Sequence, residues 1–232
     1  NPLQYDWKHI KEVCGAYGLD LITFATGREL GENGLCLLSD DASVRRAAID
    51  RLKEHIDCAQ IAGCQVIVGS MRKNVPDWSQ SDKYLGYHRE AIIELADYAR
   101  DKGVRIWVEN ILSYISNFLN TMRQVQDFVV SLPCDNVGVH LDTYSMNMED
   151  NDIAGSYRYC AKNLEYVHFS DTARLRTLLD AFACDQLGAL WDMHHPYRDH
   201  GESADTTIKN LGAYVRHVHL RDSDDDGSYD LI

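Results

Sequence analysis

The sequence predicts an α/β protein of the (β/α) TIM-barrel type, with parallel strands inside and helices outside. Three observations support this class: helical periodicity alternates with short β-branched runs, glycines end the helices, and polar residues follow the strands. At 232 residues the chain has room for one domain, whereas a complete barrel of this type needs about 250 residues. We therefore expect a barrel that is incomplete in this chain.

A helix–glycine–strand unit recurs three times in the first half of the chain. Gly18, Gly63 and Gly103 each end a run of apolar residues at helical spacing and precede a β-branched run. The predicted helices cover residues 7–17, 43–62 and 84–102. The strands predicted after them cover residues 19–25, 65–69 and 104–108. Helices and strands that alternate in this way are typical of a parallel sheet.

The same alternation continues toward the C-terminus. A helix is predicted from an N-cap at Asn120 to Leu132, and a second one over residues 155–164. Strands are expected at 136–141 and 166–169, and the last two at 187–191 and 215–220. Helices over residues 176–182 and 204–211 complete the prediction.

Composition excludes several classes of protein. The 36 acidic and 23 basic residues give a net charge of −13, which repels a phosphate backbone, so nucleic acid is not expected as a partner. No stretch approaches the roughly 20 apolar residues of a membrane span. Seven cysteines stand singly, without a C-x-x-C pair, as expected of reduced thiols in the cytoplasm. Assembly into a homo-oligomer is left open as a possibility by the sequence.

Three polar residues stand at the ends of successive predicted strands: Glu109, Asp142 and His168. Barrel geometry would bring these ends together, although each residue alone is commonly a cap, an ion-pair partner or a core histidine. Two carboxylates and one imidazole suit Mn²⁺, Mg²⁺, Co²⁺ or Zn²⁺. Their joint occurrence predicts a divalent-metal site.

Part of this pattern occurs twice. Val167-His168-Phe169-Ser170-Asp171 and Val218-His219-Leu220-Arg221-Asp222 are near copies, and a strand ending in Asp142 or Asp192 precedes each of them. Such self-similarity indicates an internal repeat. A closed barrel has only one strand at each position, so the second copy is expected to belong to a second barrel. The alternative is that it fills vacant positions in the first barrel and adds Asp192 and His219 to a composite site.

These residues resemble the metal-site motifs of the xylose-isomerase-like sugar phosphate isomerase/epimerase superfamily, especially its ketose 3-epimerase branch. The resemblance is carried by Glu109-Asn110, by the stretch from Val139 to Glu149, and by His168 with Asp171 and Arg174. It implies that Glu109, Asp142 and His168 bind the metal, that Glu109 is also the catalytic base, and that Arg174 contacts substrate oxygens.

The second copy is similar to the same superfamily and implies a further set of site residues. Asp192 and His219 would be metal ligands there, and His195 would bind substrate. In the strand numbering of a complete barrel of this superfamily, residues 1–175 would hold strands three to seven. Residues 176–232 would hold a second copy of strands six and seven, from a second, partial barrel. The chain would then join parts of two tandem barrels, as a fusion or as part of a longer protein.

This sequence also departs from the family pattern. Ser145 stands where the epimerase branch usually has a histidine, and Leu112-Ser113-Tyr114-Ile115 replaces an expected Asn-Arg-Tyr-Glu. The second Glu ligand of the final strand is not found in the sequence.

The predicted activity is isomerisation or epimerisation of a sugar or sugar phosphate. A metal held by adjacent carbonyl and hydroxyl oxygens acidifies the hydrogen on carbon and stabilises the enediolate. Three alternatives stay open: a non-catalytic barrel remnant that binds a ligand or partner, a metal-dependent lyase or dehydratase, and an endonuclease IV-like repair enzyme. The net charge of −13 disfavours the last of these.

Overall fold

The structure is a computed structural model that describes residues 2–168, 176, 189–192, 201, 203–219, 222–223 and 229–230. Its contacts divide the chain into two compact units, Asn1–Leu141 with Ser145–Tyr166, and Asp142–Tyr144 with Val167–Ile232. The boundary passes through the carboxyl ends of two neighbouring strands. Each unit is described by itself.

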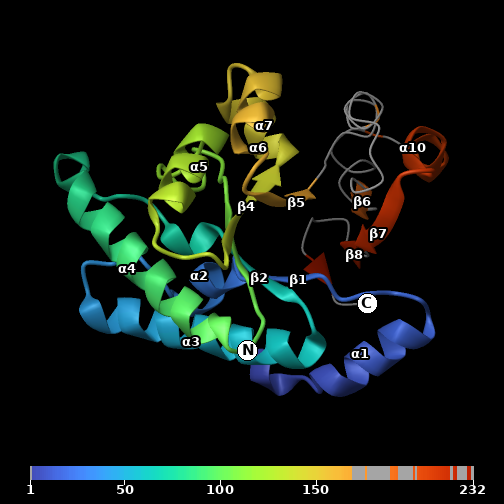
Figure 1. The fold of residues 1–232 in the computed structure, drawn as a ribbon, viewed down its shortest axis with the longest axis horizontal. Coiled ribbons are helices and arrows are strands. Elements are labelled where there is room, and N and C mark those ends of the chain that lie inside the picture. The colour runs from blue at the N-terminus through green and yellow to red at the C-terminus, as the bar shows by residue number, and fades with distance from the viewer. Residues whose placement is uncertain are drawn as a thin grey trace. The chain divides into compact units, whose positions relative to one another are not determined.

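Five strands form one sheet in the order in which they occur along the chain (Figure 1). They are β1 (Thr23–Ala25), β2 (Gln65–Val68), β3 (Ile106–Glu109), β4 (Val137–Asp142) and β5 (Leu164–His168). The pairs from β1 to β4 are parallel. Among the described residues, β1 and β5 each have one neighbouring strand, so the sheet is not closed. It forms part of a barrel. The predicted fold class is confirmed.

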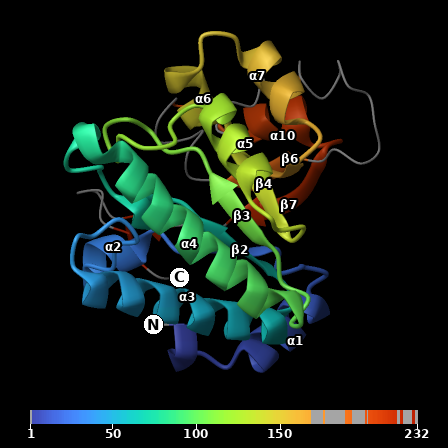
Figure 2. The same cartoon turned by 60° about the vertical axis from the view of Figure 1, so that its left-hand side comes forward.

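Helices connect the strands and cover one face of the sheet. Up to residue 160 they are α1 (Trp7–Ala16), α2 (Arg28–Asn33), α3 (Ala42–Ala62), α4 (Ser81–Arg100), α5 (Met122–Ser131), α6 (Thr143–Glu149) and α7 (Ile153–Cys160). Three short 3-10 helices are η1 (Pro2–Gln4), η2 (Ser70–Arg72) and η3 (Trp78–Gln80). The helix α3 packs on β2, while α4 and α5 pack on β3. Figure 2 shows α3 and α4 lying side by side.

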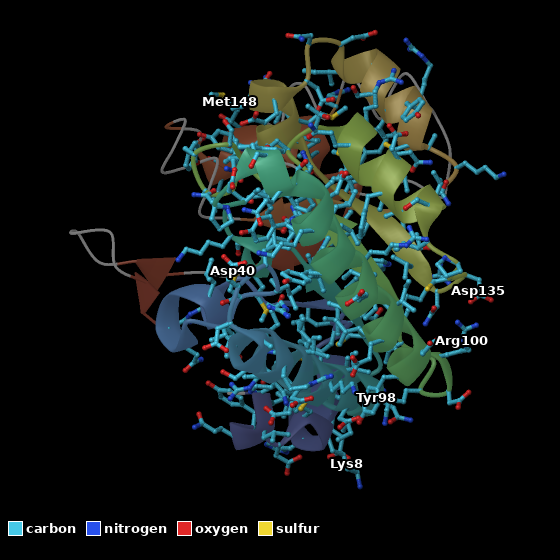
Figure 3. The ribbon with its side chains drawn as sticks, turned by 90° about the vertical axis from the view of Figure 1, so that its left-hand side faces the viewer. Lys8, Asp40, Tyr98, Arg100, Asp135 and Met148 are labelled. Carbon is cyan, nitrogen blue, oxygen red and sulfur yellow. The ribbon has the colours of Figure 1, made fainter. Side chains whose placement is uncertain are left out.

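The core lies between these helices and the strands. Alternate strand residues such as Val66, Val108 and Val139 are fully buried, and α4 contributes Ile92 and Leu95 from the opposite side. Each such side chain stabilises the fold by about 1.5–3 kcal/mol through the apolar surface that it buries. At the surface, Arg100 near the end of α4 forms an ion pair with Asp135 at 3.1 Å, just before β4 (Figure 3).

The predicted helix ends are largely confirmed. Gly18, Gly63 and Gly103 have positive φ angles of 70°, 78° and 67°, a conformation that glycine adopts without steric cost. The predicted N-cap at Asn120 is wrong. Thr121 caps α5 in a capping box with Gln124, whereas the Asn120 side chain donates hydrogen bonds to loop carbonyls.

Other boundaries also differ from the prediction. The strand expected over residues 19–25 is observed only at Thr23–Ala25, and the helix expected over 155–164 ends at Cys160, because β5 already begins at Leu164. The short helices α2 and α6 were not predicted. They are only six and seven residues long, which is too short to show a helical periodicity.

The second unit contains the elements beyond β5. The strands β6 (Ala189–Asp192) and β7 (Val215–His219) pair in parallel, and α10 (Ala204–Leu211) lies between them in sequence. A short antiparallel pair, β8 (Asp222–Ser223) and β9 (Tyr229–Asp230), follows. The helix predicted over residues 176–182 lies outside the described residues except for Arg176. The assignment of residues 176–232 to a second partial barrel stays a prediction.

Two further observations concern the described part of the chain. The six cysteines within it form no disulfide: Cys14, Cys36, Cys58, Cys64, Cys134 and Cys160. None of the helices there has the length and apolar character that crossing a membrane would require.

Candidate metal centre

Glu109 is the last residue of β3, directly after the buried run Ile106-Trp107-Val108. It is paired in register with His140 of β4, so the two side chains point to the same side of the sheet. The His140 Nδ1 lies 3.5 Å from the Glu109 Oε1. His140 is fully buried, whereas 19% of the Glu109 side chain is exposed. The Glu109 carboxylate is therefore largely shielded from solvent but still accessible to a metal ion.

Asp142 and His168 form a second pair. Each is the last residue of its strand, β4 and β5 respectively, as the sequence predicts. The His168 Nδ1 lies 4.0 Å from the Asp142 Oδ2, which is longer than a hydrogen bond. Both side chains are partly exposed, so their ligand atoms are accessible.

Three side chains at this edge of the sheet offer ligand atoms that lie within 4.8 Å of one another: Glu109, His140 and His168. One carboxylate and two imidazoles suit Mn²⁺, Co²⁺ and Zn²⁺. The sequence prediction names Glu109, Asp142 and His168. The cluster contains Glu109 and His168 but has His140, which the prediction missed, in place of Asp142. The missed signal is alternation, because His140 precedes Asp142 by two residues on one strand and therefore points to the same face.

Two aromatic side chains, Trp107 and Tyr166, lie close to Glu109 and His140. Trp107 precedes Glu109 by two residues, and its ring stacks on Tyr166 with centroids 4.8 Å apart. The His140 ring lies 5.5 Å from that of Tyr166. The Trp107 indole donates a hydrogen bond of 2.7 Å to Glu165, which also binds Arg105. Burial raises the pKa of Tyr166. An apolar floor of this kind lowers the local dielectric and strengthens charge interactions above it.

The loop after β3 differs from the expected family pattern in its exposed side chains as well as in its sequence. Leu112 is buried, whereas Tyr114 is 71% exposed and Ile115 is 43% exposed. The Ser113 amide donates a hydrogen bond of 2.7 Å to Glu149. The loop therefore presents apolar and aromatic groups where an arginine and a glutamate were expected.

The remaining predicted site residues belong to the C-terminal part. Asp192 ends β6 and His219 ends β7, and their Cα atoms are register partners in this parallel pair. The sequence repeat is thus matched by neighbouring strand ends in the second unit. Arg174 and His195 lie outside the described residues.

Comparison with known proteins identifies relatives. The profile of the xylose isomerase-like TIM barrel family matches residues 1–177. The chain is 30% identical over 179 residues to a ketose 3-epimerase of Arthrobacter globiformis, covering 75% of this chain and 60% of that protein. The chain thus spans less than two thirds of the length of this relative.

Solved structures with the same fold are also similar. A D-allulose 3-epimerase from Methylomonas sp. superposes with a TM-score of 0.66 at 25% identity, covering 79% of this chain and 68% of that one. A D-psicose 3-epimerase crystallised in the presence of D-fructose gives a TM-score of 0.67 at 22% identity, covering 81% and 70%. With five strands in barrel order and a family profile over three quarters of its length, this chain belongs to the xylose isomerase-like TIM barrel family.

Proposed function

We propose that this chain is part of a divalent-metal-dependent sugar epimerase that acts on a ketose or a sugar phosphate. The observation that carries the proposal is the placement of Glu109 at the end of β3, opposite the buried His140. The names of its relatives, ketose and D-allulose 3-epimerases, support the substrate class. Sugar hydroxyls would find hydrogen-bonding partners in the polar side chains at this edge of the sheet.

Glu109, Asp142 and His168 are the proposed metal ligands. The cluster of Glu109, His140 and His168 supports two of them and makes His140 an alternative to Asp142 on β4. When bound, the metal would act as a Lewis acid toward adjacent carbonyl and hydroxyl oxygens of the substrate. The Glu109 carboxylate would take the proton from the substrate carbon next to the carbonyl, which leads to an enediolate. Return of the proton to the opposite face of that carbon requires a second acid, which we do not assign.

The remaining predicted residues take secondary roles in this proposal. Arg174 and His195 would contact substrate oxygens, since both are polar residues of the repeated motifs. Asp192 and His219 would bind metal in the second unit, because they end adjacent parallel strands.

The proposal is tested by comparing Glu109→Gln with Glu12→Gln, a change of an exposed glutamate on α1. Mn²⁺ binding is measured by titration calorimetry, and 3-epimerisation of a ketose panel by chromatography, in the natural protein that contains this chain. Glu109→Gln removes a charged ligand and the base while preserving side-chain volume, so metal binding and turnover should both be lost. Turnover that persists in Glu109→Gln refutes the assignment.

A further inference from the structure

Arg72 is a fully buried arginine next to the candidate metal centre. It ends the 3-10 helix η2, which follows β2, and none of its surface is exposed. The guanidinium Nη2 donates a hydrogen bond of 2.7 Å to the carbonyl oxygen of Glu109. Longer contacts join Nη2 to the Leu119 carbonyl at 3.5 Å and Nη1 to the Val68 carbonyl at 3.4 Å.

The partners of this cation are unusual. Within the described part of the chain, the hydrogen-bond partners of the Arg72 guanidinium are backbone carbonyls, and its Nε has no hydrogen-bond partner. Burial lowers the pKa of Arg72 to about 10, and the negative charge of Glu109 opposes this shift. A buried charge without a close counterion costs stability, and an apolar residue of similar size often costs less. Stability alone therefore does not explain an arginine here.

The carbonyl groups that Arg72 binds mark the two ends of one loop. Glu109 begins the loop after β3 and Leu119 closes it, with a positive φ of 57°. The Ile111 amide donates to the same Leu119 carbonyl at 3.4 Å, which draws the loop ends together. The Arg72 guanidinium thus joins the start and the end of the loop that follows β3.

The segment that carries Arg72 makes further bonds to this loop. The Ser116 hydroxyl donates to the Lys73 carbonyl at 2.5 Å. The Asn117 side chain accepts from the Val75 amide at 2.7 Å and donates to the Val75 carbonyl at 3.1 Å. These outer bonds fix the middle of the loop, whereas Arg72 binds the backbone of Glu109 itself.

We infer that Arg72 is a positioning residue of the candidate metal centre. Arg72 fixes the Glu109 backbone so that the Glu109 carboxylate faces the position of the metal ion. The inference rests on the proposed function only in taking Glu109 as a metal ligand. Outer groups that orient ligands commonly change metal affinity by about 10- to 100-fold when they are removed. Arg72 would act on Glu109 through the backbone carbonyl.

The test uses the full chain with Arg72→Met, which keeps much of the apolar stem, and Arg72→Lys, which keeps the charge but loses the planar fork. Arg51→Met is the matched control, because Arg51 is a largely buried arginine that binds Glu29 on another part of the fold. Mn²⁺ affinity is measured by calorimetry, global stability by urea unfolding, and local opening by hydrogen exchange of residues 110–119.

Arg72→Met is expected to weaken Mn²⁺ binding by about tenfold or more and to speed exchange in residues 110–119, and Arg72→Lys to restore part of both. Arg51→Met should lower stability without either effect. Wild-type affinity in Arg72→Met, with metal bound by the unmodified chain, overturns the inference and leaves the proposed function standing.

If the unmodified chain binds no Mn²⁺, the proposed function fails and the exchange measurement decides the positioning role. Unchanged exchange in residues 110–119 of Arg72→Met then overturns the inference. Faster exchange confined to that loop supports the part that stands without metal, which is that Arg72 fixes the Glu109 backbone. If Arg72→Met does not fold, Arg72→Lys is read by the same criteria.

Discussion

The backbone of Gly69 lies so close to the carboxylate of Glu109 that a Cβ at residue 69 would overlap the Glu109 Oε2. The same Cβ would lie 3.0 Å from Cδ1 of Ile111. Gly69 directly follows β2, so the end of β2 leaves space for the side chain of Glu109, the candidate metal ligand on β3. A Cβ at this position would therefore displace the Glu109 carboxylate, and this leads to a prediction.

Gly69→Ala should displace the Glu109 carboxylate and weaken Mn²⁺ binding by about tenfold or more, without changing any ligand. Gly86→Ala is the control, because a Cβ at Gly86 on α4 would meet no atom within 4 Å. That control should leave metal binding unchanged and stabilise the helix by roughly 0.5–1 kcal/mol. Calorimetric affinities and urea unfolding check both. Equal metal affinity in the two variants would show that Glu109 is not a ligand.

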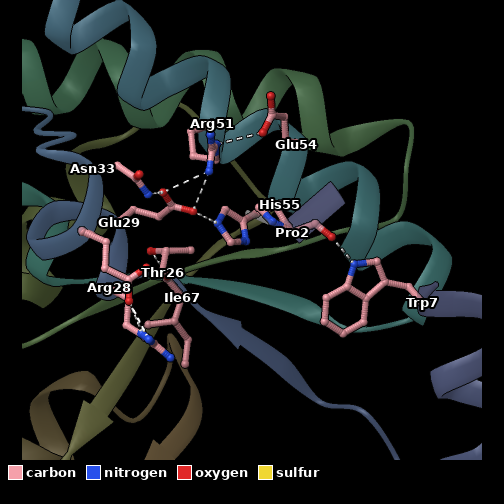
Figure 4. Close-up of polar contacts among 11 residues, drawn as sticks. Pro2, Trp7, Thr26, Arg28, Glu29, Asn33, Arg51, Glu54, His55 and Ile67 are labelled. Atoms are coloured by element: carbon pink, nitrogen blue, oxygen red, sulfur yellow. Dashed lines mark hydrogen bonds and ion pairs between the residues drawn. The ribbon is translucent and has the colours of Figure 1, made fainter. Parts of the chain in front are cut away.

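A buried carboxylate links α2 to α3. Glu29 accepts hydrogen bonds from Asn33 at 2.7 Å and from Arg51 at 3.1 Å, and its Oε1 lies 3.1 Å from the His55 Nε2 (Figure 4). Burial by itself raises the pKa of Glu29, but the hydrogen bonds from His55, Asn33 and Arg51 lower it overall. The group is therefore a charged anchor for the short helix after β1.

Glu29→Gln should lower the free energy of unfolding by about 1–3 kcal/mol, because it removes a buried charge that accepts several hydrogen bonds. Glu32→Gln on the same helix is the control. Glu32 pairs with Arg28 at the surface, and such exposed pairs contribute at most about 1 kcal/mol. Urea denaturation compares the two variants. Similar losses in both would mean that burial of Glu29 adds nothing.

The choice of the ligand on β4 is open to a direct test, since Asp142 and His140 point to the same face. Asp142→Asn should abolish Mn²⁺ binding, because it removes a charged ligand. His140→Gln should weaken binding by about 10- to 100-fold, as expected for a group that orients Glu109. Titration calorimetry measures both affinities. Complete loss in His140→Gln with a mild effect of Asp142→Asn would assign His140 as the ligand.

His88 should make the stability of the fold depend on pH. It is fully buried in α4, and its ring stacks on Phe128 with centroids 4.8 Å apart. Neither ring nitrogen has a hydrogen-bond partner among the described residues. Burial, and secondly the charge of Arg72, lower the pKa of His88 well below 6.5. Folded His88 therefore stays neutral where an unfolded histidine takes up a proton.

The unfolded state thus binds more protons than the folded state below pH 6.5, so stability is full above that pH and falls as the pH decreases. The slope from one such group reaches about 1.4 kcal/mol per pH unit. His88→Phe should reduce this slope between pH 6.5 and 5, while His9→Gln at an exposed position should not. Part of the slope should persist in His88→Phe, because burial also lowers the pKa of His55. An unchanged slope in His88→Phe would contradict the assignment.

The sequence by itself determined the order of elements and the strand-end residues. Glycines at 18, 63 and 103 mark helix ends because only glycine adopts a positive φ without cost, and these signals are local. Glu109, Asp142 and His168 stand at or near the ends of predicted strands in the sequence, and each is the last residue of its strand in the structure. Local signals failed at short elements such as α2 and at the cap of α5, where several residues could serve.

Only the tertiary structure decided which groups contact one another across strands. The nearness of His140 to Glu109 depends on the register between β3 and β4, which no local pattern records. Arg72 reads as an ordinary surface cation in the sequence, and its burial under the Glu109 carbonyl follows from the packing of two loops. Register and loop packing depend on contacts between residues that are distant in the chain, so they are determined by the folded whole.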